Sequence, residues 1–249
     1  MEWLTILLLS YLASPAVAAA AAKNLADYSS AAVSLFGNMR TPAALIGGAL
    51  INLGILSAPP INKSDSKSIR LMKRGNMILA VASLLSEILA VTYSSIAINK
   101  LAEVKSPKTT CVEELITRNY ELAWVGTNVH FLAGLVGFAL IVGARVYSKY
   151  GNPTGRIAIC WSVAAFLQAL SVINNGIAMG SGSEDDESTR FASNIFTLAL
   201  RYMSLVVTNA FGGGICAIGS LLFACAASYL TFITLVLNPD GEEELTKED

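Results

Sequence analysis

Residues 81–99 have the sequence VASLLSEILAVTYSSIAIN, an apolar run with one acidic side chain, Glu87, near its middle. At about 1.5 Å of helix per residue, the run is close in length to the hydrocarbon core of a bilayer, which is about 30 Å thick. It therefore predicts a transmembrane helix. A glutamate inside such a helix is unfavourable, so the residues around it have to account for its presence.

The composition of the whole chain indicates a membrane setting. Hydrophobic residues make up 54% of the 249 residues and charged residues only 14%, whereas about 25% of the residues in soluble domains are charged. The charges gather in short segments between apolar runs. No basic stripe with interleaved aromatic residues is present outside one short loop, so the sequence predicts a lipid bilayer and no nucleic acid as its surroundings.

The distribution of apolar segments predicts an all-α, polytopic helical membrane protein with four long transmembrane helices and a short N-terminal membrane segment. The predicted spans are residues 41–57, 77–99, 122–147, 157–179 and 215–237. The first of them is the weakest, because its helix reaches only about 25 Å. Thr41 and Pro42 are predicted to be its N-cap and its first-turn proline.

The apolar run toward the C-terminus is too long for one span and needs a break. Three consecutive glycines, Gly212, Gly213 and Gly214, mark the place where a helix bends or ends most easily. They separate a packed or interfacial helix at 195–210 from the last span. Residues 23–237 are then predicted to form one helical domain, followed by an acidic, disordered tail at 238–249.

The first 22 residues are typical of a targeting segment. An apolar core and the A-x-A pattern at Ala16, Val17 and Ala18 predict a secretory-type signal peptide or the first part of a bipartite targeting sequence. Glu2 departs from the basic start expected of a signal peptide. An uncleaved apolar helix is the alternative interpretation.

Loop charges predict the orientation in the membrane. The five basic residues between positions 63 and 74 are accompanied by a single acidic residue, Asp65. Loops rich in Lys and Arg stay on the cytosolic side. We therefore expect the 63–74 loop on that side and the acidic loop at 184–187 on the opposite side.

The sequence lacks the residues that carry the common enzymatic chemistries. His130 is the only histidine, which excludes the two-histidine H-E-x-x-H zinc motif, and the four cysteines form no C-x-x-C pair. There is no G-x-S-x-G elbow and no P-loop. The sequence predicts neither an enzyme nor a metal site, and the acidic residues 184–187 are interpreted as a solvated loop.

Helical spacing indicates where Glu87 points. Ser83, Glu87, Ala90 and Ser94 follow one another at intervals of four, three and four residues, which places them on one face of a helix. A small and polar face of this kind suits packing against other helices. The apolar residues of the span contribute about −5 kcal/mol against a cost of about 3 kcal/mol for Glu87, so the helix inserts, with Glu87 facing the bundle.

Other spans supply polar side chains that we expect to meet this face and to form a buried polar cluster with Glu87. They are Asn128, His130, Gln168, Thr208 and Asn209. Gly134, Gly137 and the glycine triplet let backbones approach closely. Three interpretations of the cluster remain open: hydrogen bonding that holds the bundle together, a proton or cation site at Glu87, or a chlorophyll magnesium bound by His130.

A resemblance to a known family rests on three stretches: MRTPAALIGGALINLG at 39–54, LLSEILAVTYSSIAINKL at 84–101 and RNYELAWVGTNVHFLAGLVGFALIVGARVY at 118–147. They resemble segments of a family of multi-span membrane proteins of photosynthetic chromophyte algae, the diatoms and their relatives. The resemblance covers about residues 40–147 and rests on hydrophobic motifs. It implies an endomembrane or plastid membrane and transfers no catalytic or binding residues to this chain.

The leading interpretation is a non-enzymatic, multi-pass membrane protein that serves as a scaffold or accessory subunit of a larger membrane complex, with other membrane proteins as partners. The alternative is a small transporter or channel with Glu87 in a proton or cation pathway. Transporters commonly show an internal repeat or a helix broken at mid-membrane, and in this sequence only the glycine triplet offers such a break.

Overall fold

The computed structural model describes residues 25–62, 64–179, 192–212 and 215–237. Nearly all of these residues are helical. In chain order the helices are α3 (Ser29–Leu50), η1 (Ile51–Leu56), α4 (Lys67–Glu103), α5 (Val112–Asn119), α6 (Glu121–Tyr150), α7 (Thr154–Met179), α8 (Ile195–Gly212), α9 (Ile215–Phe232) and η3 (Ile233–Leu237). The short elements η1 and η3 are π-helical and continue α3 and α9.

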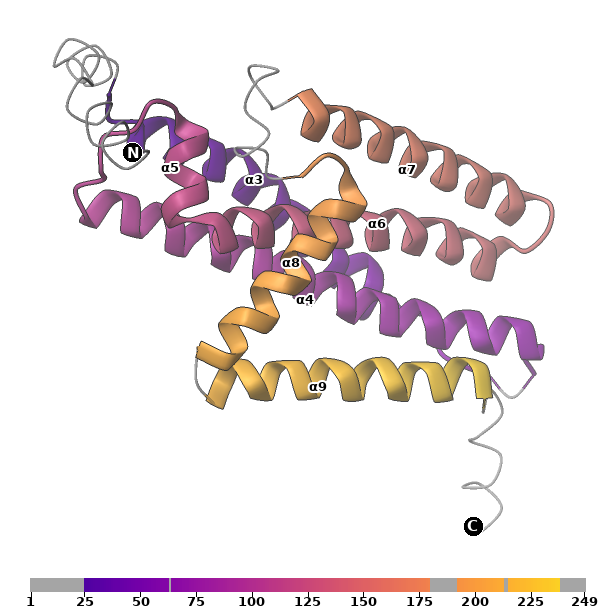
Figure 1. The fold of residues 1–249 in the computed structure, drawn as a ribbon. Helices are drawn as coiled ribbons and strands as arrows, with labels where there is room; N and C mark the ends of the chain where they lie inside the picture. The colour runs from indigo at the N-terminus through magenta and orange to yellow at the C-terminus, as the bar shows by residue number, and fades with distance from the viewer. Residues whose placement is uncertain (1–24, 63, 180–191, 213–214, 238–249) are drawn as a thin grey trace, which may run out of the picture.

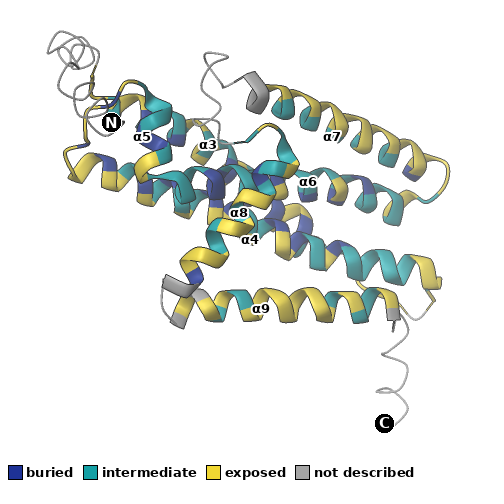
Figure 2. Cartoon of the chain, in the orientation of Figure 1, coloured by how far each residue is buried: buried dark blue, intermediate teal, exposed yellow. Residues whose placement is uncertain are grey.

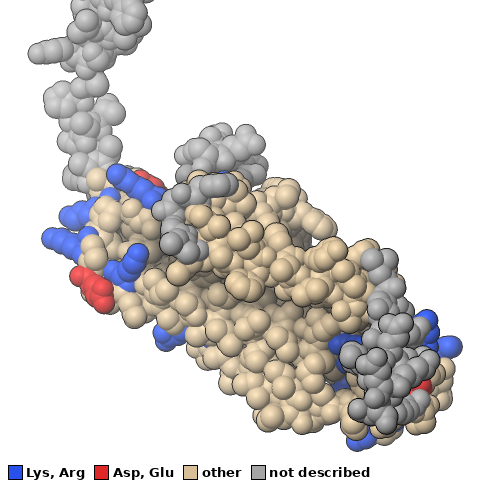
Figure 3. Space-filling view, turned by 90° about the horizontal axis from the view of Figure 1, so that it is seen from below, with Lys and Arg blue, Asp and Glu red and all other residues tan. Residues whose placement is uncertain are grey.

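Five helices among the described residues are long and apolar enough to cross a membrane. They comprise Ser29–Leu56, Lys67–Glu103, Glu121–Tyr150, Thr154–Asn175 and Ile218–Val236. The axes of the long helices α4, α6, α7 and α9 are roughly aligned across the molecule (Figure 1). Lys and Arg side chains gather at the two ends, and the belt between them is uncharged on the face shown in Figure 3. The predicted class, an all-α polytopic membrane protein, is confirmed.

The first membrane helix begins earlier than the sequence analysis predicts. α3 starts at Ser29 and contains Pro42 in its interior, so the predicted N-cap at Thr41 is wrong. The Thr41 hydroxyl instead lies 3.4 Å from the carbonyl oxygen of Gly37 in the preceding turn. A proline inside a helix removes one backbone hydrogen bond, and the buried side chain of Phe36 helps to hold the preceding turns. With η1 the helix has 28 residues, long enough to span.

α4 extends beyond the predicted span of 77–99 at both ends. The Ser66 hydroxyl oxygen accepts a hydrogen bond from the backbone amide of Ile69 at 3.4 Å and caps the helix. The basic residues from Lys67 to Arg74 therefore form the first turns of α4 and not a loop. Lys and Arg are strong helix formers, so the helix starts well before its apolar part.

The remaining helices begin and end close to their predicted bounds. α6 and α7 are a few residues longer than 122–147 and 157–179. α8 and α9 occupy the predicted packed helix and last span, and α8 ends at Gly212. Gly213, Gly214, the targeting segment 1–22, the acidic loop 184–187 and the tail 238–249 lie outside the residues that the structure describes.

A compact cap closes the end of the bundle that lies beside α5. The buried residues Ala32, Phe36, Leu101, Leu115 and Ile116 pack there in one hydrophobic cluster. The rings of Phe36 and Trp124 meet edge to face with centroids 5.4 Å apart. The segment before α3 is joined to the α4–α5 connection by an isolated antiparallel bridge between Ala26 and Thr109.

α7 and α9 lie at the periphery. The most apolar windows of their spans contain no buried residue, whereas those of α3, α4 and α6 do. Figure 2 shows both helices mostly in the colour of exposed residues, with α8 crossing the molecule obliquely to reach α9. The packed core is therefore a bundle of three helices, α3, α4 and α6.

Candidate functional site: the buried face of α4

The buried face of α4 follows a regular seven-residue repeat. Its buried residues, at alternating intervals of four and three, are Asn76, Ala80, Ser83, Glu87, Ala90, Ser94, Ala97 and Leu101. This spacing keeps one seam of a helix against its neighbours over many turns. The two largest interfaces of the protein lie along it, with α6 and with α3. All four residues of the stripe proposed from the sequence, Ser83, Glu87, Ala90 and Ser94, are on this seam.

Glycines on the neighbouring helices make room for the polar residues of the seam. A Cβ atom added to Gly134 of α6 would lie 2.6 Å from Cγ of Glu87, and one added to Gly137 would lie 2.7 Å from Cβ of Ser83. On the opposite side, a Cβ atom on Gly47 of α3 would be in ordinary contact, 3.5 Å from Cβ of Glu87. The backbones of α4 and α6 can approach this closely only because both α6 positions are glycine.

Glu87 is enclosed between α3 and α6. Its side chain is 1% exposed, and neither carboxyl oxygen has a hydrogen-bond partner among the described atoms. Burial of an unpaired polar group is unfavourable, so the packing around Glu87 has to compensate for it. A lone buried carboxyl group in a membrane helix is a candidate functional group.

The polar cluster predicted around Glu87 does not form. The Asn128 amide donates to the Trp124 carbonyl oxygen at 2.8 Å, and the Thr208 hydroxyl donates to the Ser204 carbonyl oxygen at 2.8 Å. Gln168 and Asn209 are exposed. The prediction was wrong because Asn and Thr side chains in helices can be satisfied by the carbonyl group one turn earlier.

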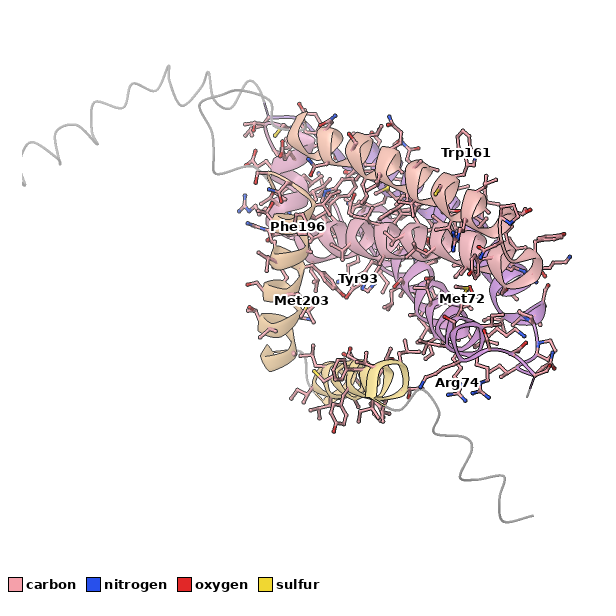
Figure 4. All side chains as sticks on the ribbon, turned by 90° about the vertical axis from the view of Figure 1, so that its right-hand side faces the viewer. Met72, Arg74, Tyr93, Trp161, Phe196 and Met203 are labelled. Carbon is pink, nitrogen blue, oxygen red and sulfur yellow. The ribbon has the colours of Figure 1, made fainter. Side chains whose placement is uncertain are left out.

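His130 belongs to a second group of polar side chains, which joins three helices. Its Nε2 atom is hydrogen-bonded to the hydroxyl group of Tyr202 on α8 at 2.6 Å. The Tyr202 ring meets the imidazole edge to face at 5.1 Å, and the ring of Tyr93 on α4 stacks on it at 6.0 Å. Figure 4 shows Tyr93 on the side of α4 that faces α8.

Tyr93 and Tyr202 were missed by the sequence analysis. The signal that marks them is a tyrosine hydroxyl inside an apolar helix, since a buried tyrosine usually finds a hydrogen-bond partner. Together with His130 they hold α8 against the core. An ion pair between Arg201 of α8 and Glu121 of α6 reinforces this attachment.

One of the two ring nitrogens of His130 already has a hydrogen-bond partner. Nε2, one of the two ring nitrogens that bind metals, is occupied by the Tyr202 hydroxyl. Within the described part of the chain, no group of three or more His, Cys, Asp or Glu residues is placed to hold a metal ion. The imidazole acts here as a hydrogen-bonding link between α6 and α8.

Comparison with known proteins adds no relative. No protein-family model, curated protein or solved structure matches the chain. The resemblance of residues 40–147 to the chromophyte membrane proteins therefore stays a prediction.

Proposed function

We propose that the protein is a non-enzymatic, multi-pass membrane protein that acts as a scaffold or accessory subunit of a larger membrane complex. One observation carries this proposal: α7 and α9 have no buried residue in the most apolar windows of their spans. A helix with so little of its surface buried inside the protein presents most of that surface to lipid or to other proteins. The three-helix core supplies the rigid part of such a subunit.

Large side chains on the peripheral helices support this proposal. Trp161 of α7, Phe196 of α8 and Phe223 of α9 are 73%, 81% and 80% exposed. Figure 4 shows Trp161 pointing away from the bundle. Aromatic residues are enriched in the contact surfaces of protein complexes, where they contribute much of the binding energy.

Photo-crosslinking in the native membrane tests the proposal. A photoreactive amino acid at Trp161 or Phe223 should capture another membrane protein. The same amino acid at Ala90, which is fully buried in the core, should give only crosslinks within the chain. Crosslinks to lipid alone from both peripheral positions, with a monomeric mass in mild detergent, would count against a scaffold.

A second candidate function is a proton or cation pathway through Glu87. The observation that favours it is the absence of a hydrogen-bond partner for either carboxyl oxygen in the described structure. Intramembrane carboxyl groups commonly mark such pathways. Neither of the two pockets discussed below includes Glu87 among its lining residues, and for this reason we rank the pathway second.

Flux measurements in reconstituted vesicles separate the two candidates. Glu87→Gln should abolish a proton or cation flux, because the titratable group is lost and the shape is kept. Ser94→Ala is the matched control on the same seam, since the Ser94 hydroxyl bonds only to carbonyl oxygens of its own helix. Equal flux through the wild type and the Glu87→Gln variant would exclude the pathway.

The N-terminal sequence pattern and the chromophyte resemblance support an endomembrane or plastid membrane as the location. A fluorescent protein fused to the C-terminus, observed in a photosynthetic alga, tests this part of the proposal. The basic end of α4 is proposed to face the cytosolic or an equivalent side. Labelling of a cysteine introduced at Ser64 with an impermeant reagent, in vesicles of known orientation, tests the side.

A further inference from the structure

The basic end of α4 borders a pocket of about 600 Å³. The segment that follows η1, the first turns of α4 and the start of η3 surround it. Lys73 and Arg74 form its polar wall, and Pro59, Ile61 and Met77 are among its apolar residues. The pocket thus combines positive charge with an apolar lining.

A mainly apolar groove of about 840 Å³ adjoins this pocket and shares Ile78 with it. Residues from α4, α6, α7, α9 and η3 line the groove, with Leu79, Ala82, Leu140 and Leu235 among them. Figure 4 shows Met72, which lines the groove, and Arg74, which lines the pocket, on opposite sides of α4. A lateral opening of this kind within a bilayer is accessible to acyl chains.

The pocket and the groove lie at the depths that the headgroup and the acyl chains of a phospholipid occupy in a bilayer. Arg74 and Lys100 are the first charged residues before and after Glu87 on α4, each 13 positions away, so Glu87 marks the middle of the span. At about 1.5 Å per residue Arg74 lies about 20 Å from the level of Glu87, beyond the half-thickness of about 15 Å of the hydrocarbon core. The pocket therefore lies at the level of lipid headgroups, and the groove at the level of acyl chains.

Asn76 is a second, independent observation that points to a ligand. Its side chain lines the groove and is only 7% exposed, yet its Oδ1 atom has no hydrogen-bond partner among the described atoms. It lies about 16 Å from the level of Glu87, at the boundary between hydrocarbon and headgroups. A buried amide there is placed to hydrogen-bond the polar glycerol region of a lipid.

The charge around the pocket favours an anionic headgroup. Six basic residues occupy this end of the described structure besides Lys73, namely Lys67, Arg70, Arg74, Arg145, Lys149 and Arg156. Lys73 is held by the carboxylate of Asp65 at 2.6 Å and by the Pro60 carbonyl oxygen at 2.8 Å. Among the described residues at this end Asp65 is the one acidic side chain, so their summed formal charge is positive.

We propose that this pocket and groove bind one acidic glycerophospholipid of the surrounding bilayer. Its phosphate lies beside Arg74 and Lys73, its glycerol region beside Asn76, and an acyl chain in the groove between α4 and α9. The lipid fills the space at the basic end, where within the described residues α9 meets α4 chiefly through η3.

Lipid binding to the full-length protein in detergent tests the proposal, with phosphatidylglycerol and phosphatidylcholine of identical acyl chains as the probes. The protein should bind phosphatidylglycerol more tightly. Arg74→Gln should weaken that binding about fivefold, since one basic residue near an anionic lipid surface contributes about 1 kcal/mol. Lys100→Gln, at the same depth on the other side of Glu87, is the matched control and should leave the affinity unchanged.

A second pair of variants tests the groove without changing any charge. Ala82→Trp places a large ring in the groove and should reduce the binding of both lipids. Val81→Trp, at the exposed neighbouring position, should not. Circular dichroism verifies that each variant is folded.

Three results would overturn the proposal. One is equal affinity for both phospholipids in the wild type, and another is unchanged affinity in both Arg74→Gln and Ala82→Trp. The third is binding of phosphatidylglycerol only after deletion of residues 238–249, because the acidic tail of the chain itself would then be the occupant.

Discussion

Glu87 of α4 lies directly over Gly134 of α6, and its carboxyl group occupies the space that a side chain at position 134 would need. The same relationship recurs one turn away between Ser83 and Gly137. Both of these polar residues on α4 are thus matched by an α6 position with no side chain. This pairing fixes both the rotation of the two helices and the register between them.

Gly134→Ala should destabilise the protein by about 1–3 kcal/mol, because the new methyl group overlaps the Glu87 carboxyl group. Glu87→Ala in the same chain should restore most of the loss, since it empties the space. Thermal unfolding of the two single variants and the double variant in detergent gives the coupling energy. Purely additive effects would contradict the contact.

Gly137→Ala should also destabilise the bundle. The added methyl group would lie 2.7 Å from Cβ of Ser83, an atom that cannot move without its backbone, so α4 and α6 must separate. Gly48→Ala on α3 is the control, because a Cβ atom there meets nothing within 4 Å. It should be neutral or stabilise the helix by up to about 1 kcal/mol. The melting temperature of Gly137→Ala should therefore be lower than that of Gly48→Ala.

Glu87→Met should leave the stability unchanged or raise it. The sequence analysis predicted hydrogen-bonding partners for Glu87, whose loss would make an apolar replacement unfavourable. Among the described residues there is none. An apolar side chain of similar shape then removes an unpaired polar group and leaves no other polar group without a partner. A melting temperature clearly below that of the wild type would reveal a partner of Glu87.

Tyr202→Phe should loosen α8 from the core. The variant keeps the ring contact with His130 and loses the hydrogen bonding of the Tyr202 hydroxyl group. One side-chain hydrogen bond in membrane proteins contributes about 0.6 kcal/mol on average. Hydrogen exchange across α8, followed by mass spectrometry, should increase. Thr208→Val on the same helix should not change it, because the Thr208 hydroxyl bonds only within α8.

The connection between η1 and α4 should become mobile in acid. The hydrogen bond from Lys73 holds the pKa of Asp65 below its usual value of 3.8. A carboxyl group with a lowered pKa in the folded state stabilises that state above its unfolded-state pKa, and the contribution is lost as the pH falls through the folded-state value. A spin label at Ile61 should therefore gain mobility below about pH 3.8. In an Asp65→Asn background its mobility should be high at neutral pH and nearly independent of pH.

The features that could be predicted from the sequence are those that depend on one helix alone. The lengths of the apolar segments indicated where the spans lie. Helical spacing placed Ser83, Glu87, Ala90 and Ser94 on one face. The start of α3 could not be predicted in the same way. Pro42 is a local sign of a helix start, and only the packing of residues far from it, such as Phe36, shows that the helix begins earlier.

Contacts between helices could not be predicted, because they depend on how each helix is rotated about its axis. Asn128 and His130 were both expected to meet Glu87. In the structure Asn128 bonds to its own helix and His130 to Tyr202 of α8. A polar residue in a span is a sign that some partner exists, and the sequence does not say whether the partner is a side chain or the backbone one turn away.

The order of the interfaces along the chain has a consequence for biosynthesis. The three largest interfaces join α3 to α4, α4 to α6 and α6 to α7, so each of these four helices packs chiefly on a long helix made just before or just after it. A nascent chain can therefore assemble in the order in which it leaves the ribosome. The Glu87 carboxyl group is then not enclosed by α6 until Gly134 has been synthesised. The interval between the synthesis of these two residues is the stage at which the growing protein most needs protection from lipid and from other nascent helices.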